Sequence, residues 1–272
     1  KVLIVIRLTS YKLYIKEFDT VMIADAIRGR DVIEFIRRVN PNARIIIYYL
    51  NSVLDNGRNS PDKYNGLSCE LYTFDKKNAR EYNIEFRHFF YRYMNRKECK
   101  IEVADDSIMQ DVFFVGSDKG RLNELMALAA KLEALGITSR VLVERTRHKF
   151  YWGAKRQATI SRAIPYEDVI KNIRQSKAIL DIVQKGQHGL TWRPMEAMCF
   201  RKKLITNDPE IESYSFFKKE NIFVLGKRSL SELPQFINSD YVPVSQDILD
   251  EYMTENWMET FFSESNGIVD ID

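Results

Sequence analysis

The sequence lacks several features that would place it in a specialised class of protein. It has no run of about 18 apolar residues, so no transmembrane helix is expected. It shows no charged segment followed by an apolar stretch and a small-residue cleavage site, so no secretory signal is expected. Repeats of solenoid period and low-complexity segments are also missing. The 272 residues, 45% apolar and 29% charged, are therefore expected to form two ordinary globular domains.

Cysteine is scarce, and metal-binding patterns are not visible. The three cysteines, Cys69, Cys99 and Cys199, are scattered and odd in number. This pattern indicates free thiols in a reducing compartment, in place of a disulfide framework or a zinc site. No pair of aspartates with the spacing of a metal site stands out. We therefore expect a cytoplasmic protein without a bound metal or other cofactor.

The net charge of +3 is unevenly distributed along the chain. Residues 1–105 carry 19 Lys/Arg and 14 Asp/Glu, residues 106–246 carry 22 and 16, and residues 247–272 carry none and eight. A nucleic-acid-binding protein would concentrate its basic residues on one face, so nucleic acid is not expected as a partner. The acidic tail is instead expected to dock on basic surface of the protein.

Strand-like and helix-like segments alternate through the first 105 residues. The runs "KVLIVIRL", "TVMIAD" and "ARIIIYYL" are rich in β-branched residues and predict buried strands. Between the last two, apolar residues recur at helical spacing until Asn40-Pro41, which should end the helix. This pattern is typical of a βαβ unit and hence of a parallel sheet. "CELYTFD" and "KKNAREYN" predict a further strand and helix.

A second alternating series begins near residue 106. "DVFFVGS" predicts a strand, and the leucines of 118–136 predict a helix that Gly136 could end. Further strands and helices follow to residue 244, and residues 246–261 predict an amphipathic C-terminal helix with Ser245 as its N-cap. The expected fold is α/β with two Rossmann-like, doubly wound halves in tandem. The expected domains are residues 1–105, 106–244 and, as a helix and tail that pack back on the first domain, 245–272.

The first candidate binding segment is "DVFFVGSDKGRLNEL". A strand ends at Gly116, and a polar turn containing Ser117, Lys119 and Arg121 opens a helix. Backbone N–H groups at a helix start, with cations beside them, form a site for a diphosphate. The alternative is a routine turn in which Asp118 caps the helix. The segment matches neither the Walker motif nor GxGxxG.

The second candidate segment is "QKGQHGLTWRPMEAM", residues 184–198. It follows a predicted strand, so it should cross the carboxyl edge of the second sheet, where such folds bind ligands. Glu196, in the first turn of the next helix, could accept hydrogen bonds from a ribose diol. Backbone N–H groups of Gly189, Leu190 and Thr191 would face a phosphate. The alternative is that Glu196 only complements the helix dipole.

The stretch "GLTWRPMEAMCFRKKLITND" resembles the donor-binding segment of GT-B glycosyltransferases, which has a glycine-rich loop, Glu-Ala-Met/Leu and a short strand ending in Thr-Asn/Asp. Together with "CELYTFDKKNAREYNIEFRHFFY", it is most similar to glycosyltransferases of bacterial lipopolysaccharide and capsule biosynthesis. The resemblance extends over most of residues 70–263. It implies transfer of a sugar from a nucleotide-sugar donor, the co-substrate, to a growing surface glycan without a bound metal.

The resemblance also assigns roles to residues. Many retaining relatives have a second glutamate eight positions before the first, where this chain has His188, so both stereochemical outcomes stay open. A catalytic base would come from a strand end of the first half, where Asp25 and Asp75 lie, although either could be a cap or turn residue. His188 and Asp25 are the candidate catalytic residues. The candidate donor-binding residues are Gly116, Ser117, Lys119, Arg121, Gln187, Gly189, Leu190, Thr191, Arg193 and Glu196.

Residues 86–100, "FRHFFYRYMNRKECK", mix five Lys/Arg with five aromatic residues. Such a mixture suits a peripheral contact with an anionic membrane, here the inner face of the cell membrane. It equally suits a buried helix whose cations reach the surface. The partners expected are the nucleotide-sugar donor and a glycan or lipid-linked glycan acceptor. Two other functions remain open, a GT-B-like sugar-nucleotide epimerase and a non-catalytic nucleotide-sugar-binding module.

Overall fold

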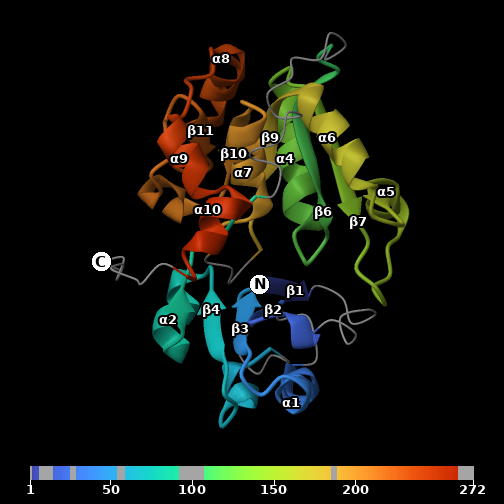
Figure 1. Ribbon diagram of the computed structural model, residues 1–272. Helices are drawn as coiled ribbons and strands as arrows, with labels where there is room; N and C mark the ends of the chain where they lie inside the picture. The colour runs from blue at the N-terminus through green and yellow to red at the C-terminus, as the bar shows by residue number, and fades with distance from the viewer. Residues whose placement is uncertain are drawn as a thin grey trace. The chain divides into compact units, whose positions relative to one another are not determined.

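The chain folds into two compact α/β units (Figure 1). The first unit contains the described residues up to Phe89 together with Gly189 and Leu190, and the second contains the other described residues. The boundary expected from the sequence falls after residue 105, whereas Phe90 and Tyr91 already belong to the second unit. The computed structural model describes residues 2–5, 15–24, 29–53, 59–91, 107–184 and 189–262.

The first unit is built on a parallel sheet whose described strands run in chain order, β1-β2-β3-β4-β5. The predicted βαβ unit is present, because β2 and β3 are parallel neighbours joined by α1. No reversal of strand order occurs among the described strands of this sheet. Its elements are β1 (Val2–Val5), η2 (Ile15–Glu17), β2 (Thr20–Ala24), α1 (Gly29–Val39), β3 (Arg44–Tyr49), η3 (Pro61–Tyr64), β4 (Glu70–Thr73), α2 (Lys76–Tyr82) and β5 (Glu85–Phe86).

Helix α1 ends where the sequence predicts. Asn40 follows its last residue, and the Asn40 side chain donates hydrogen bonds to the carbonyl oxygens of Ile15 at 3.1 Å and Phe18 at 2.9 Å. Residues Ile33 and Ile36 of the helix are almost fully buried in one cluster with the strand residues. The side chain that ends the helix therefore also ties it to the segment before β2.

The described residues of the second unit form six parallel strands in the order β11-β10-β9-β6-β7-β8. The chain moves from β6 outward to β8, returns to the other side of β6 and continues to β11, which is the doubly wound order of the Rossmann fold. The predicted α/β fold class is confirmed. The elements are β6 (Gln110–Ser117), α4 (Leu122–Ala134), β7 (Ser139–Glu144), α5 (Gly153–Gln157), β8 (Thr159–Ile160), α6 (Tyr166–Arg174), β9 (Ser176–Asp181), α7 (Trp192–Cys199), β10 (Lys203–Thr206), η4 (Pro209–Ser213), β11 (Ile222–Val224), η5 (Leu230–Glu232), α8 (Leu233–Asn238), α9 (Gln246–Glu251) and α10 (Thr254–Glu259).

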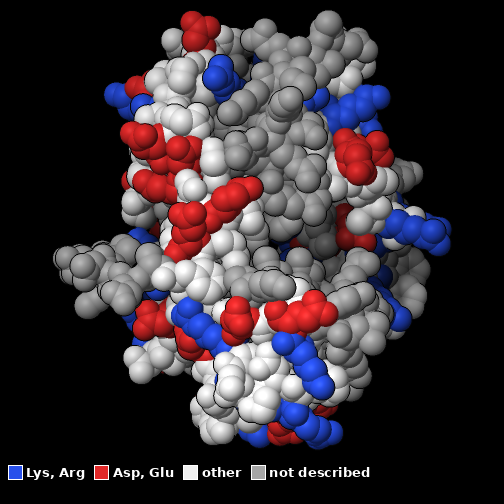
Figure 2. All heavy atoms as spheres, viewed as in Figure 1, with Lys and Arg blue, Asp and Glu red and all other residues white. Residues whose placement is uncertain are grey.

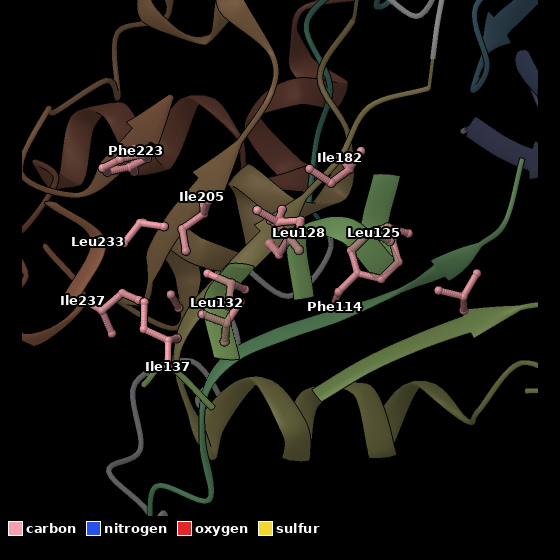
Figure 3. Packing of buried hydrophobic residues seen from close by; sticks show 14 of the residues in the cluster. Phe114, Leu125, Leu128, Leu132, Ile137, Ile182, Ile205, Phe223, Leu233 and Ile237 are labelled. Carbon is pink, nitrogen blue, oxygen red and sulfur yellow. The ribbon is translucent and has the colours of Figure 1, made fainter. Parts of the chain in front are cut away.

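Helix α4 anchors the core of the second unit. Its residues Leu125, Leu128 and Leu132 pack in one cluster with strand residues and with α8, as Figure 3 shows. The helix ends at the predicted glycine. Gly136 has φ +72°, a conformation that favours glycine, and the next N–H, of Ile137, donates to the Leu132 carbonyl oxygen at 2.9 Å.

The C-terminal segment forms two short helices in place of the single predicted one. The break lies at Tyr252 and Met253, which are both buried. The Tyr252 carbonyl oxygen accepts a hydrogen bond from the N–H of Tyr91 at 2.9 Å. In a continuous helix, this oxygen would instead accept a hydrogen bond from within the helix. Both helices, α9 and α10, belong to the second unit.

Two expectations about special segments can be compared with the structure. None of the helices in the described ranges is both long and apolar enough to cross a bilayer. The expectation of three free thiols is wrong, because Cys199 is disulfide-bonded, whereas Cys69 is free. Cys99 lies outside the described residues.

The core position of α4 makes a testable prediction. Leu125 is fully buried and Lys131 on the same helix is exposed. Leu125→Ala should remove about 2–5 kcal/mol of stability, because the deletion leaves a cavity. Lys131→Ala should change stability by less than about 0.5 kcal/mol. Thermal and urea unfolding of both variants measures the difference, and equal midpoints would contradict the packing of α4.

Candidate functional site

The reversal of strand order in the second sheet marks the candidate site. Strands β6 and β9 are neighbours, but the chain leaves them in opposite directions along the sheet. Connections that diverge in this way leave a crevice at the carboxyl ends of the two strands, where doubly wound folds bind ligands. Strand β6 ends at Ser117 and β9 at Asp181. Both segments singled out in the sequence follow these strands.

The turn after β6 contains two residues with left-handed backbone and a glycine close to a cation. Lys119 and Gly120 have φ angles of +42° and +89°, and this left-handed region is strained for most residues but not for glycine. Gly116 makes room for a cation, because a Cβ atom there would lie only 2.7 Å from Nη2 of Arg121. The turn can therefore bring Arg121 against the end of β6.

Arg121 lies across the ends of both strands. Its Nε donates to the Ser117 carbonyl oxygen at 3.2 Å, and its Nη1 donates to the carbonyl oxygen of Ile182, the residue after β9. Its guanidinium carbon lies 5.1 Å from the centre of the Phe114 ring. Burial, with a smaller effect of Arg193, lowers the pKa of Arg121, although Asp181 opposes this. A partly buried cation is thus fixed at the point where the strand order reverses.

Asp118 occupies part of the helix start that the sequence suggested for a phosphate. Its Oδ1 accepts the N–H of Leu122 at 3.0 Å, and its Oδ2 accepts from Lys149 Nζ at 2.5 Å and from Tyr151 Oη at 2.7 Å. The residue is fully buried. Burial alone would raise the pKa of Asp118, but the hydrogen bonds from Lys149 and Tyr151 outweigh it and hold the pKa below its usual range. The alternative reading, in which Asp118 caps the helix, is therefore realised.

The other two polar side chains of this turn differ in availability. The Ser117 hydroxyl donates to Glu144 Oε2 at 3.1 Å, so it is engaged at the end of β7. Lys119 is exposed, and no described residue hydrogen-bonds to or pairs with its side chain. Burial of part of the side chain, and then the charge of Arg121, lower the pKa of Lys119. Lys119 is the cation of this turn that is open to an incoming anion.

Asp181 and Thr191 connect the end of β9 to the start of α7. The Thr191 hydroxyl donates to Asp181 Oδ2 at 3.0 Å and accepts the N–H of Arg193 at 3.1 Å, so it caps the helix. Asp181 is almost fully buried, and burial raises the pKa of its carboxyl group to about 6. The charges of Arg193 and Arg121 act in the opposite direction. Asp181 thus feels the charge of both arginines of the site.

Glu196 is more enclosed than the sequence suggests. Helix α7 begins at Trp192, because Thr191 caps it, so Glu196 lies in its second turn and not in its first. Its side chain is fully buried. Oε1 accepts from Tyr166 Oη at 2.8 Å, and Oε2 accepts from Nη1 of Arg193. Burial raises the pKa of Glu196 against the opposing effects of Arg193 and Tyr166.

A tyrosine pair supports Glu196 from outside the two candidate binding segments. Tyr166, at the start of α6, shares a hydrogen bond of 2.7 Å with the hydroxyl of Tyr91. Burial, with the charge of Glu196, raises the pKa of Tyr166, so its hydroxyl stays protonated and donates. Sequence reasoning missed Tyr166, for which the local pattern holds no signal. It also missed Asp181, whose signal is a carboxylate inside the apolar run "AILDIV".

Several predicted residues lie elsewhere or outside the described part of the chain. Gly189 and Leu190 belong to the first unit, and Gly189 lies against Phe74 so closely that a Cβ atom would be 2.3 Å from its ring. Asp75 caps α2, fully buried, and accepts the Ser52 hydroxyl at 2.6 Å, so it has the cap role that was its alternative. Asp25, Gln187 and His188 are outside the described residues.

The site therefore combines Lys119, Arg121 and Arg193 with two buried carboxyl groups, of Asp181 and Glu196. The cations suit a multiply charged oxyanion such as a diphosphate, and a buried carboxylate suits a pair of hydroxyl donors. Within the described ranges, no three His, Cys, Asp or Glu side chains converge as a metal site would require.

Comparisons with known proteins identify no family. No protein-family profile and no curated protein matches the chain. Among solved structures, AviGT4, a glycosyltransferase involved in avilamycin A biosynthesis, is 11% identical, with a TM-score of 0.49 over 89% of this chain and 82% of its own. The catalytic domain of starch synthase IV from Arabidopsis thaliana, bound to ADP and acarbose, is 11% identical, with a TM-score of 0.46 over 88% of this chain and 69% of its own. Likenesses of this size say nothing about the activity of this chain.

The buried Asp181 makes stability depend on pH. Its pKa of about 6 lies above the unfolded value of about 3.9, so the folded state holds the proton more tightly. Stability therefore falls as pH rises from about 4 to 6 and stays lower above that range. Asp181→Asn cannot ionise and keeps an oxygen for Thr191. It should be more stable than the wild type above pH 7, by on the order of 1–3 kcal/mol, and nearly equal at pH 4.

Thermal unfolding at a series of pH values measures this difference. Glu167→Gln, at an exposed carboxylate of α6, is the matched control and should follow the wild type at every pH. An Asp181→Asn profile parallel to the wild type would show that Asp181 is not held in a proton-binding environment.

Proposed function

We propose that this protein is a glycosyltransferase that moves a sugar from a nucleotide-sugar donor to a growing bacterial surface glycan, of the lipopolysaccharide or capsule type. The observation that carries the proposal is the group of three cations and two buried carboxyl groups at the reversal of strand order between β6 and β9. Nucleotides bind doubly wound sheets at that place. The resemblance of residues 189–208 to the donor-binding segment of GT-B glycosyltransferases names the reaction and the acceptor class.

The cations serve the departure of the diphosphate. Transfer breaks the bond between the anomeric carbon and the diphosphate oxygen, and negative charge grows on that oxygen as the bond lengthens. Lys119 is open to solvent, and Arg121 is already fixed at the strand ends. Cations positioned before the reaction stabilise the developing charge without reorganisation. We assign Lys119, Arg121 and Arg193 to the leaving diphosphate.

Glu196 serves the ribose, but only after Arg193 moves. In the structure both carboxylate oxygens are engaged and the side chain is fully buried. When a nucleotide binds, the Arg193 guanidinium turns to the diphosphate, which offers it a stronger charge. Oε2 of Glu196 then accepts hydrogen bonds from the ribose hydroxyls, while Tyr166 continues to hold Oε1. Asp25 and His188 remain the proposed catalytic residues, and the acceptor lies on the side of the first unit.

The donor class is tested first by thermal unfolding of the wild type with UDP, GDP, CMP or ADP. A nucleotide at about 100 times its Kd adds roughly 2.7 kcal/mol, which raises the midpoint by several degrees. One nucleotide should give this shift. If none does, the proposed donor site does not bind a nucleotide by itself, and the proposal is contradicted. A shift without sugar transfer to any acceptor would favour the non-catalytic binding module. Sugar release from the donor without an acceptor would instead favour the epimerase.

The exchange of partners at Glu196 predicts opposite effects of two substitutions. Glu196→Gln should weaken the binding of both the nucleoside diphosphate and its nucleoside by about 1–3 kcal/mol, because a charged acceptor for the ribose is lost. Arg193→Met should weaken the binding of the nucleoside diphosphate only. Binding of the nucleoside should be unchanged or tighter, because Glu196 is no longer paired with Arg193. Titration calorimetry measures the affinities, with Glu167→Gln as the control. A folded Glu196→Gln protein with wild-type affinity would refute the ribose contact.

A further inference from the structure

The stretch that the sequence suggested for a membrane contact is built into the core where it is described. Residues 86–100 are described only to residue 91. In that part Phe89 and Tyr91 are buried at 3% and 2% exposure, and Phe90 stacks on Trp257 with ring centres 4.1 Å apart. These aromatic rings are therefore not available to a lipid surface.

A different segment presents large aromatic side chains to solvent. Phe150 and Trp152 are 84% and 76% exposed, the two most exposed large apolar side chains among the described residues. They lie in the segment that follows β7 and runs through α5, residues 145–157, which we call the cationic aromatic loop. Exposing two side chains of this size to water is unfavourable in free energy, because burial of each against an apolar phase would be stabilising.

The loop is held in place by its own buried residue. Tyr151, between the two exposed rings, is buried, and its hydroxyl donates to Asp118 and accepts the N–H of Thr146 at 2.8 Å. Arg145 ties the base of the loop to Thr159 through a hydrogen bond of 2.9 Å. The exposed rings are thus displayed on an ordered scaffold, so little conformational entropy is lost when they bind.

The same segment is strongly cationic. The loop contains five Lys/Arg and no Asp/Glu, and Arg162 follows it. The four residues Arg147, Lys155, Arg156 and Arg162 are exposed, and no described side chain pairs with any of them. In Figure 2 cationic side chains project from the right-hand edge of the second unit, near α5 of Figure 1. An anionic partner would neutralise these charges.

The exposed rings and the cations around them suit a lipid surface. Phe150 and Trp152 stack on each other with ring centres 6.1 Å apart and planes 27° apart. The two rings are neighbours and together form one exposed apolar pair. The loop contains no Asp, Glu or Asn, and its one Gln is its last residue, Gln157. A protruding apolar pair surrounded by cations suits the interface of a bilayer.

We propose that the cationic aromatic loop is a docking site for an anionic lipid bilayer. Phe150 and Trp152 insert at the level of the headgroups, and Arg147, Lys155 and Arg156 lie over the negative surface. This proposal does not depend on glycosyl transfer, because it rests on the exposed loop alone. It would place the second unit beside a lipid-linked substrate if the proposed function holds.

The full chain is tested with vesicles of phosphatidylcholine, with and without roughly one third phosphatidylglycerol. Sedimentation should show at least about tenfold stronger partitioning into the anionic vesicles, and salt should weaken it. The double variant Phe150→Ala/Trp152→Ala and the triple variant Arg147→Ala/Lys155→Ala/Arg156→Ala should each reduce partitioning at least about tenfold. Both change exposed residues, so circular dichroism should show an unaltered fold.

Matched controls separate the loop from overall charge. The triple variant Lys131→Ala/Lys171→Ala/Lys219→Ala removes three exposed cations of the same unit and should partition like the wild type. Trp152 should report the contact by a shift of its fluorescence to shorter wavelength, and Trp152→Phe should bind without this shift. Equal losses in both triple variants would overturn the proposal. So would the absence of partitioning, or a preference for heparin or single-stranded DNA that vesicles do not displace.

Discussion

The candidate site depends on the hydrogen bonds that Arg121 donates at the ends of two strands. Arg121 joins the carboxyl ends of β6 and β9 through two backbone carbonyl oxygens, at the place where the strand order reverses. Gly116 leaves the space that its guanidinium occupies. Doubly wound folds bind ligands at this place in the sheet, so Arg121 fixes a positive charge where a ligand is expected.

Two buried carboxyl groups accompany this cation at a cost to stability. Burial raises the pKa of both Asp181 and Glu196, so the ionised form of each carboxyl group carries a desolvation cost. Arg193 and the hydroxyl donors Thr191 and Tyr166 offset part of that cost. Carboxyl groups with perturbed pKa values are common at functional sites, which agrees with the nucleotide site proposed above.

Asp118 connects the site to the cationic aromatic loop. Its carboxylate takes hydrogen bonds from the first turn of α4 and from two residues of the loop, Lys149 and Tyr151. One buried side chain thus orders both the turn that carries Lys119 and the segment that displays Phe150 and Trp152. A ligand at either place meets a surface whose shape is already set.

The sequence by itself determined the alternation of strands and helices, since apolar periodicity and end signals such as Asn40 and Gly136 act over a few residues. It also located the two segments of the site, because chain order places them after strands of one sheet. Only the tertiary structure decided which side chains are open. The capping role of Asp118, the enclosure of Glu196 by Tyr166 and Arg193, and the break at Tyr252 all depend on partners far away in the chain. Burial and hydrogen bonding are properties of the packed molecule, and no local pattern encodes them.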